Sequence, residues 1–290
     1  MIIVMKRQAR AQDVAAVVDF IRAKGLREHV SVGQERTIIG AVGDERVFLP
    51  QELERLPQVE RAVRVLDDWR IISRETQPQD CTVAVRGRTF GGGSVLDIAS
   101  DAARAEEADA VYLDPFFVEN NPYAAAVRLS EKEQIKAMRE AVSAVHRTGR
   151  PVLLRLRDAR QLPSVLDAAA DILYLGGGMI GNRALLDEIG RLNTPVVLCK
   201  DKHHSYRDWL TAAEHVALKG NQQIILGEAG TLNPNADFPY RLDTEALVRV
   251  KQICRLPVLA DISGLWHNHM PQEILRRLAT AAGADAVIGG

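Results

Sequence analysis

The sequence predicts an α/β protein in which a small α+β module precedes a (β/α)8 TIM barrel. Three observations predict this fold. Short apolar runs of strand length recur eight times after residue 93, helical patterns separate most of them, and the first 66 residues instead follow the order βαββαβ. Eight strands with intervening helices favour a closed barrel over an open doubly wound sheet, which seldom needs so many strands.

Composition and charge argue against several classes of partner. The chain has 290 residues, 47% of them hydrophobic and 26% charged, which is ordinary globular composition with room for two domains. Its 37 basic and 38 acidic residues give a net charge of −1, so we expect neither nucleic acid nor a membrane as partner. Three widely separated cysteines and the lack of a long apolar run lead us to expect a soluble, cytoplasmic protein.

The first module has the pattern of a ferredoxin-like fold, the split βαβ arrangement. Strands are predicted at 2–5, 29–32, 37–42 and 59–66, and helices at 12–25 and 50–56. Antiparallel strands with both helices on one face make up this fold. Such a module usually senses a ligand or binds a partner. We assign residues 1–69 to it and residues 70–93 to a linker and a hairpin.

Residues 94–290 are predicted to form the barrel. Strands are expected at 94–99, 110–113, 152–156, 172–175, 196–199, 224–226, 258–260 and 286–288. Helices are expected at 132–147, 163–169, 182–191, 206–219, 244–254 and 271–282. No helical stretch follows the eighth strand, so we expect a barrel that lacks a final helix. Either a partner covers this edge or it is bare, and we expect a homo-oligomer.

Polar side chains cluster where the barrel strands end, which is where barrel enzymes place their active sites. Converging charges at these positions suit a small anionic metabolite with a carboxylate or phosphate group. The predicted ligand-binding residues are Asp114, Arg155, Arg157 and Lys202. The predicted catalytic residues are Lys200, Glu228 and Asp261, which follow buried apolar runs. Some polar residues are expected in any solvated loop.

The N-terminal module resembles a known regulatory domain. The stretch His29–Glu45, with 63–66 and 71–75, is similar to the N-terminal domain and linker of the type Iβ 3-deoxy-7-phosphoheptulonate (DAHP) synthases, and the resemblance runs from residue 1 to about 93. In that family aromatic amino acids bind this module and shut off the barrel. The resemblance therefore implies an aromatic amino acid effector that contacts His29 and Ser31. The alternative is that His29 only packs on its strand.

The barrel resembles the same family in its framework more than in its site. The framework match lies in Ala170–Gly176, 194–198, 209–215, 219–230 and 256–261. Where the family has a Lys-Pro-Arg-Thr-Ser-Pro-Tyr loop, this chain has Phe117–Tyr123 without those cations, and the arginine after the fourth strand is Gly178. Its Leu-Lys-Arg-Gly and Glu-Arg-Gly motifs read Leu198–Asp201 and Glu228–Gly230. Such cations carry most phosphate recognition, so we expect the family's condensation of phosphoenolpyruvate with erythrose 4-phosphate to be lost.

The resemblance also implies a divalent metal, held in the family by a cysteine, a histidine, a glutamate and an aspartate. The first three positions fall near Ala102, at Gly264 and at Gly290, and the fourth lies beyond the printed chain. His267 and His269 could form a different metal site with His203 or His204 and a nearby carboxylate, because imidazole and carboxylate ligands suit Zn, Fe or Mn. The alternative is that they are ordinary loop histidines.

Three functions remain open from the sequence. The first is a divergent enzyme of aldolase or transferase type that acts on or binds a carboxylated or phosphorylated small molecule. In a metal-free version Lys200 would serve as the amine nucleophile. The second is a catalytically inactive regulatory pseudoenzyme that partners an active DAHP synthase. The third is an active DAHP synthase of aromatic amino acid biosynthesis.

Overall fold

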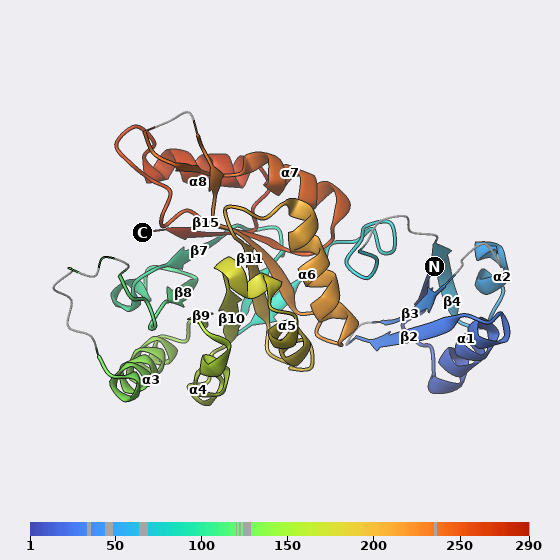
Figure 1. Cartoon of the computed structure of the whole chain (residues 1–290). Helices are drawn as coiled ribbons and strands as arrows, with labels where there is room; N and C mark the ends of the chain where they lie inside the picture. The colour runs from blue at the N-terminus through green and yellow to red at the C-terminus, as the bar shows by residue number, and fades with distance from the viewer. Residues whose placement is uncertain are drawn as a thin grey trace.

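The computed structural model describes residues 1–33, 36–43, 49–63, 69–119, 121, 123, 129–234 and 237–289. It consists of a small N-terminal module and a barrel, which lie side by side in Figure 1 with the module next to helix α6. The fold class predicted from the sequence is confirmed: a closed eight-stranded parallel barrel follows a ferredoxin-like α+β module.

The N-terminal module is a four-stranded antiparallel sheet with two helices on one face. Its elements are β1 (Ile2–Met5), α1 (Ala11–Ala23), β2 (Arg27–Val32), β3 (Thr37–Val42), α2 (Pro50–Glu54) and β4 (Val59–Val63), and its strand order is β2-β3-β1-β4. Val17 and Leu53, from the two helices, pack in one cluster with Ile3 of the sheet. The last three residues of the predicted strand 59–66 lie outside the described residues.

The opposite face of this sheet packs against the barrel. Strand side chains alternate between the two faces, so Ile2 and Val4 point away from the cluster that contains Ile3. Both are buried in the main barrel core together with Trp69 and Ile71 of the linker. The module therefore shares a continuous apolar contact with the barrel. The predicted domain boundaries, at residues 69 and 93, stay predictions.

The barrel strands occur where the sequence predicts them, and four of them, β11, β12, β15 and β16, end one or two residues later than predicted. The strands are β7 (Leu96–Ala99), β8 (Ala110–Leu113), β9 (Val152–Leu156), β10 (Ile172–Leu175), β11 (Val196–Lys200), β12 (Ile224–Glu228), β15 (Val258–Asp261) and β16 (Ala286–Gly289). They pair in parallel and in sequence order, and β16 pairs with β7 to close the barrel. Lys200, Glu228 and Asp261 are the last residues of their strands and not the first residues of loops.

The outer helices also match their predictions to within a few residues. They are α3 (Glu131–Arg147), α4 (Leu162–Asp167), α5 (Arg183–Ile189), α6 (Tyr206–Leu218), α7 (Thr244–Ile253) and α8 (Gln272–Ala281). Short 3-10 turns lie at Ala102–Arg104, Ala159–Gln161 and Gly177–Gly181. Only the first of these turns stands between β7 and β8, where the other units have a longer helix.

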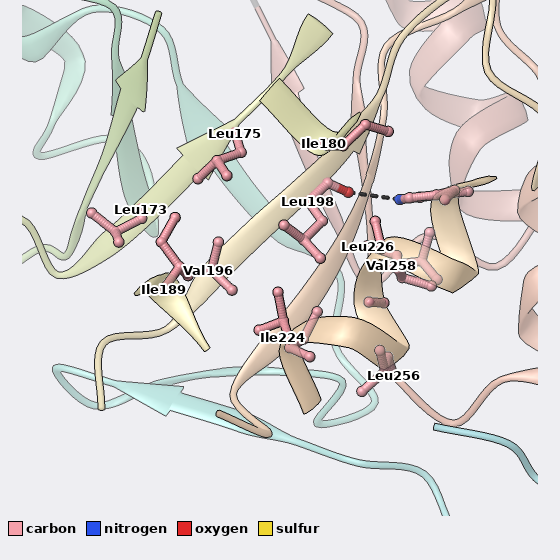
Figure 2. Packing of buried hydrophobic residues seen from close by; sticks show 14 of the residues in the cluster. Leu173, Leu175, Ile180, Ile189, Val196, Leu198, Ile224, Leu226, Leu256 and Val258 are labelled. Carbon is pink, nitrogen blue, oxygen red and sulfur yellow. Dashed lines mark hydrogen bonds between the residues drawn. The ribbon is translucent and has the colours of Figure 1, made fainter. Parts of the chain in front are cut away.

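Alternating strand residues form two separate apolar layers. Figure 2 shows the outer layer, in which Leu198 of β11 and Leu226 of β12 lie between the strands and the helices. The indole nitrogen of Trp209 on α6 donates a hydrogen bond of 2.6 Å to the Leu198 carbonyl, which ties this helix to the sheet. The inner layer includes Tyr174 of β10 and also Phe90 from the hairpin β5 (Val83–Val85) and β6 (Arg88–Phe90). The hairpin therefore belongs to the barrel core.

Candidate functional site

A polar cavity of about 140 Å³ lies at the carboxyl ends of the barrel strands. We call it the mouth cavity. Its polar lining side chains are Arg155, Tyr174, Lys200, Asp201, Lys202, Asp261 and Ser263. This is the end of a barrel at which catalytic side chains gather. The structure thus brings four predicted site residues to one cavity: Arg155, Lys200, Lys202 and Asp261.

Lys200 is buried and surrounded by oxygen atoms. Its side chain is 1% exposed, and its Nζ lies 3.1 Å from Asp243 Oδ2 and 3.5 Å from Glu228 Oε1. The same amine donates a hydrogen bond of 3.2 Å to the Gly230 carbonyl. Asp243 also caps the N-terminus of α7 by accepting from the Ala246 amide. Two carboxylates and a carbonyl therefore fix the amine at the cavity wall.

Glu228 lies behind Lys200 and is completely buried. Burial raises the pKa of Glu228 to about 7, while the neighbouring charge of Lys200 acts in the opposite direction. Its Oε1 accepts a hydrogen bond of 2.5 Å from the Gly230 amide, and its Oε2 has no partner among the described residues. A carboxyl group with such a pKa can take up or release a proton near neutral pH.

Asp261 is held by two hydroxyl groups. Its Oδ2 accepts a hydrogen bond of 2.8 Å from Tyr174, and its Oδ1 accepts one of 2.6 Å from the Ser263 hydroxyl. Burial raises the pKa of Tyr174 well above its usual value, so this phenol stays protonated and acts as a donor. The two donors satisfy the carboxylate and fix its orientation toward the cavity.

Arg155, on β9, lines the mouth cavity. Its Nη1 donates a hydrogen bond of 3.1 Å to the Tyr112 hydroxyl, and its guanidinium lies 5.5 Å from the centre of the Tyr174 ring. A Cβ atom at Gly176 would lie 3.1 Å from Arg155 Nη2. The missing side chain at residue 176 therefore leaves room for the guanidinium.

Asp114 and Arg157 lie beside the mouth cavity and do not line it. Arg157 binds Asp114 through two hydrogen bonds, Nε to Oδ1 at 2.8 Å and Nη2 to Oδ2 at 2.5 Å. Arg155 Nε lies 3.8 Å from the same carboxylate. Asp114 is therefore placed where it can position Arg155, and the ligand-binding role of Asp114 and Arg157 stays a prediction.

Lys202 stands at the rim of the mouth cavity, just after β11. Its Nζ lies 4.4 Å from the centre of the Tyr240 ring, within the range of a cation–π contact. Tyr240 belongs to the small hairpin β13 (Thr231–Leu232) and β14 (Tyr240–Arg241), which follows β12. A cation in this position can meet an anion that enters the cavity.

The histidines of the predicted metal site do not come together. His203 is exposed, His267 stacks on Phe238 with ring centres 4.6 Å apart, and the rings of His267 and His269 are 6.3 Å apart. In the part of the chain that the structure describes, no three His, Cys, Asp or Glu side chains form a group that could hold a metal ion. The expected convergence of these histidines with Asp261 is therefore not found.

The residues at the family's metal positions do not fit a metal either. Of the positions that the resemblance implies, the structure describes Ala102 and Gly264, and neither has a donor atom in its side chain. We therefore derive the chemistry of the mouth cavity from its own side chains.

The predicted effector residues lie on β2, on the sheet face that meets the barrel. Ser31 is buried, and its hydroxyl accepts a hydrogen bond of 3.1 Å from Gln222 of the barrel. His29 lines a separate cavity of about 200 Å³, together with Arg70 of the linker and Glu214 of α6. The two residues therefore face the junction between module and barrel.

Sequence reasoning missed three contributors to the mouth cavity: Tyr174, Asp243 and Ser263. Tyr174 reads as a core aromatic residue of a buried strand, and only the closed barrel turns its hydroxyl toward Asp261. In the sequence Asp243 has the pattern of a helix N-cap, which does not predict its ion pair with Lys200.

No helix among the described residues is long and apolar enough to cross a membrane.

Comparisons with known proteins agree on one family. The model of the DAHP synthase ferredoxin-like domain matches residues 1–67, and the model of the DAHP synthetase I family matches residues 129–289. The phospho-2-dehydro-3-deoxyheptonate aldolase of Thermotoga maritima is 30% identical over 305 residues, a match that covers 99% of this chain and 88% of that protein.

Solved structures give the same picture. The crystal structure of the DAHP synthase from Thermotoga maritima superimposes with a TM-score of 0.66 at 27% identity, over 99% of this chain and 86% of that one. The truncated form of 3-deoxy-D-arabino-heptulosonate 7-phosphate synthase from Thermotoga maritima, at 23% identity, has a TM-score of 0.63 over 76% of this chain and 84% of that one, and it supports the fold alone. The chain belongs to the DAHP synthetase I family and carries the ferredoxin-like domain of DAHP synthases at its N-terminus.

Proposed function

We propose that the mouth cavity binds a small carboxylated or phosphorylated molecule and acts on it without the family's metal-dependent condensation. The observation that carries this proposal is the convergence of Arg155, Lys200 and Lys202 on one cavity. Guanidinium and ammonium groups are the usual partners of carboxylates and phosphates. The absence of a metal-binding side-chain group among the described residues supports the second half of the proposal.

In this proposal Arg155 and Lys202 bind the anionic group of the ligand, and Lys200 and Glu228 exchange a proton. The Lys200 amine lines the cavity, and Glu228 contacts it from behind. With a pKa of about 7, Glu228 can accept a proton from the amine and return it. Once its proton has passed to Glu228, the Lys200 amine can add to a carbonyl carbon of the ligand: the C=O π bond opens, Glu228 returns the proton to that oxygen, and water leaves to give an imine. Asp261, held by Tyr174 and Ser263, is the remaining acceptor for a ligand hydroxyl proton.

Calorimetric titration with phosphoenolpyruvate tests the binding half. Lys202→Gln should weaken binding at least tenfold, because it removes a rim cation without touching the buried core. Arg160→Gln is the matched control, since Arg160 is exposed and, within the described residues, its ion pair is with Asp158. Equal affinities for the wild type and Lys202→Gln would overturn the assignment of this site.

The family relationship favours a second candidate, retained DAHP synthase activity. The Thermotoga maritima enzyme is 30% identical over nearly the whole chain. The assay is the consumption of phosphoenolpyruvate with erythrose 4-phosphate in the presence of Mn²⁺, Zn²⁺ or Fe²⁺. We expect no turnover above background. Turnover that a chelator abolishes would establish the second candidate and refute the first.

A regulatory role for the N-terminal module is compatible with either candidate. Two kinds of contact link the module to the barrel. Ile2 and Ile38 pack into the barrel core, and Ser31 accepts a hydrogen bond from Gln222. We propose that an aromatic amino acid acts at His29 and Ser31. If the barrel is inactive, the same module would regulate an active synthase, and co-purification with that synthase tests this version.

A further inference from the structure

A second polar cavity, of about 190 Å³, lies between the N-terminal module and the barrel. We call it the junction cavity. Its lining comes from three places: Gly33 and Arg36 of the turn between β2 and β3, Gln77 of the linker, and the barrel turns that contain Gln222 and Arg255. These barrel turns precede β12 and β15, so the cavity lies at the amino ends of the strands, opposite the mouth cavity.

Arg255 is the unusual residue of the junction cavity. It is only 6% exposed, and its side chain makes one hydrogen bond, from Nε to the Ile71 carbonyl at a long 3.4 Å. Among the described residues neither of its terminal nitrogens has a hydrogen-bond partner, and no carboxylate forms an ion pair with it. The two terminal nitrogens are accessible from the junction cavity, so an anion in it can accept hydrogen bonds from them.

The other charged residues of the lining are already paired. Arg36 binds Glu60 at 2.5 Å, and Asp80 forms an ion pair with Arg74. The side-chain amide of Gln77, a residue that is 7% exposed, also has no hydrogen bond to a described residue. The described lining thus presents one unmatched positive charge and an uncommitted amide to an enclosed space.

We propose that the junction cavity binds a small anion, a carboxylate or a phosphate, that Arg255 recognises it, and that the bound anion fixes the N-terminal module against the barrel. The cavity is smaller than the roughly 300–1,000 Å³ of typical ligand sites, which suits a compact anion. A Cβ atom at Gly33 would lie 2.7 Å from Gln222 Oε1, so the turn of the module directly contacts the barrel beside the cavity. Because catalysis in barrels occurs at the opposite end, this site is regulatory.

Calorimetric titration with inorganic phosphate and, separately, with malonate tests the binding. The wild type should bind the anion at one site whose dissociation constant changes by less than twofold in Lys202→Gln. In Arg255→Met the dissociation constant of this site should rise at least tenfold. Malonate binding alone assigns the site to carboxylates, and phosphate binding alone assigns it to phosphates. If neither anion binds at a site sensitive to Arg255, the proposal is wrong. Sensitivity to Lys202 alone would leave only the mouth cavity as an anion site.

A second variant covers the case in which Arg255→Met does not fold. Asn193 is exposed at the rim of the junction cavity, and Asn193→Asp places a negative charge there without altering the core. It should weaken the same site several-fold, whereas the exposed control Arg160→Gln should not. An unchanged dissociation constant in Asn193→Asp would count against an anion at this position.

Hydrogen exchange tests the coupling to the module. Saturating anion should slow exchange of the β2 amides, Arg27–Val32, several-fold in the wild type and leave them unchanged in Arg255→Met. Anion binding without any protection of β2 would refute the role in fixing the module while leaving the site itself intact.

Discussion

The barrel has a polar cavity at each end, and the two cavities differ in how their buried cations are partnered. In the mouth cavity Lys200 lies 3.1 Å from Asp243 and 3.5 Å from Glu228. In the junction cavity Arg255 is almost as well buried, yet no described carboxylate pairs with it. Among the described residues, the buried cation of the mouth cavity therefore has its counter-charges without a ligand, whereas Arg255 in the junction cavity has none.

This difference indicates how each cavity would respond to an anion. An anion in the mouth cavity must compete with Asp243 and Glu228 for Lys200, so binding there rearranges existing contacts and favours proton movement. An anion in the junction cavity supplies a missing charge, so binding there mainly adds stability. Removing the cation should consequently have opposite effects on stability at the two ends.

The largest expected effect comes from replacing Lys200 with methionine. The change leaves Asp243 and Glu228 facing each other without the amine, and breaking a buried ion pair in this way costs about 3–5 kcal/mol. Urea unfolding measures it. Lys136→Met is the control, because Lys136 and Glu140 form an exposed pair on α3 whose loss should cost about 0.5 kcal/mol or less.

The matching change at the other end sharpens the contrast. In buffer without small anions, Arg255→Met should be at least as stable as the wild type, because no described carboxylate pairs with the charge that the change removes. If Arg255→Met lowered the free energy of unfolding as much as Lys200→Met does, both cations would have counter-charges within the protein. The comparison between the two cavities would then fail.

The next effect concerns the pH dependence of stability through Glu228. Burial raises the pKa of Glu228 from its ordinary 4.5 to about 7, so between these pH values the native state keeps a proton that the unfolded chain has released. The stabilisation from this group is complete below about pH 4.5 and is lost as the pH rises through about 7. Between about pH 4.5 and 7, the free energy of unfolding of the wild type should therefore fall by up to about 3 kcal/mol relative to that of Glu228→Gln.

Urea unfolding at successive pH values checks this prediction. The difference between the wild type and Glu228→Gln isolates the one carboxyl group, because the other titrating groups are common to both proteins. Parallel stability curves from pH 4 to pH 8 would mean that Glu228 is ionised in the folded protein throughout. It could not then exchange a proton with Lys200 near neutrality.

The sequence predicted the framework well and the site only in part, for identifiable physical reasons. The position of Lys200 and Asp261 at the mouth cavity could be predicted because an apolar run reveals where a strand ends, and a strand end fixes the position of a side chain; their catalytic roles stay predictions. The orientation of His267 could not be predicted because its ring stacks on Phe238, a contact between distant parts of the chain that the local pattern does not encode. Arg255 reads as an ordinary turn residue, since only the packing of two domains buries it.

A smaller effect should follow from removing one hydroxyl group in the mouth cavity. Tyr174→Phe deletes the donor that holds Asp261 Oδ2, and leaving a buried acceptor with one donor fewer costs about 1–3 kcal/mol. Tyr206→Phe is the control, because no described residue accepts a hydrogen bond from the Tyr206 hydroxyl. If both variants unfold at the same urea concentration, the Tyr174 hydroxyl does not orient Asp261.

The smallest effect is expected at the junction, where Ser31→Ala removes the hydroxyl that accepts a hydrogen bond from Gln222. A single neutral hydrogen bond contributes about 0.5–1.5 kcal/mol, and the partly exposed Gln222 amide can turn to water, so the loss should lie at the low end. Ser205→Ala, at the N-cap of α6, should cost more, about 1 kcal/mol, because the Ser205 hydroxyl caps a helix.

Because Ser31 also faces the barrel at the proposed effector site, Ser31→Ala separates two roles of this residue. Unchanged stability combined with a lost response to aromatic amino acids would assign Ser31 to effector binding, and a stability loss with an intact response would assign it to holding the module on the barrel.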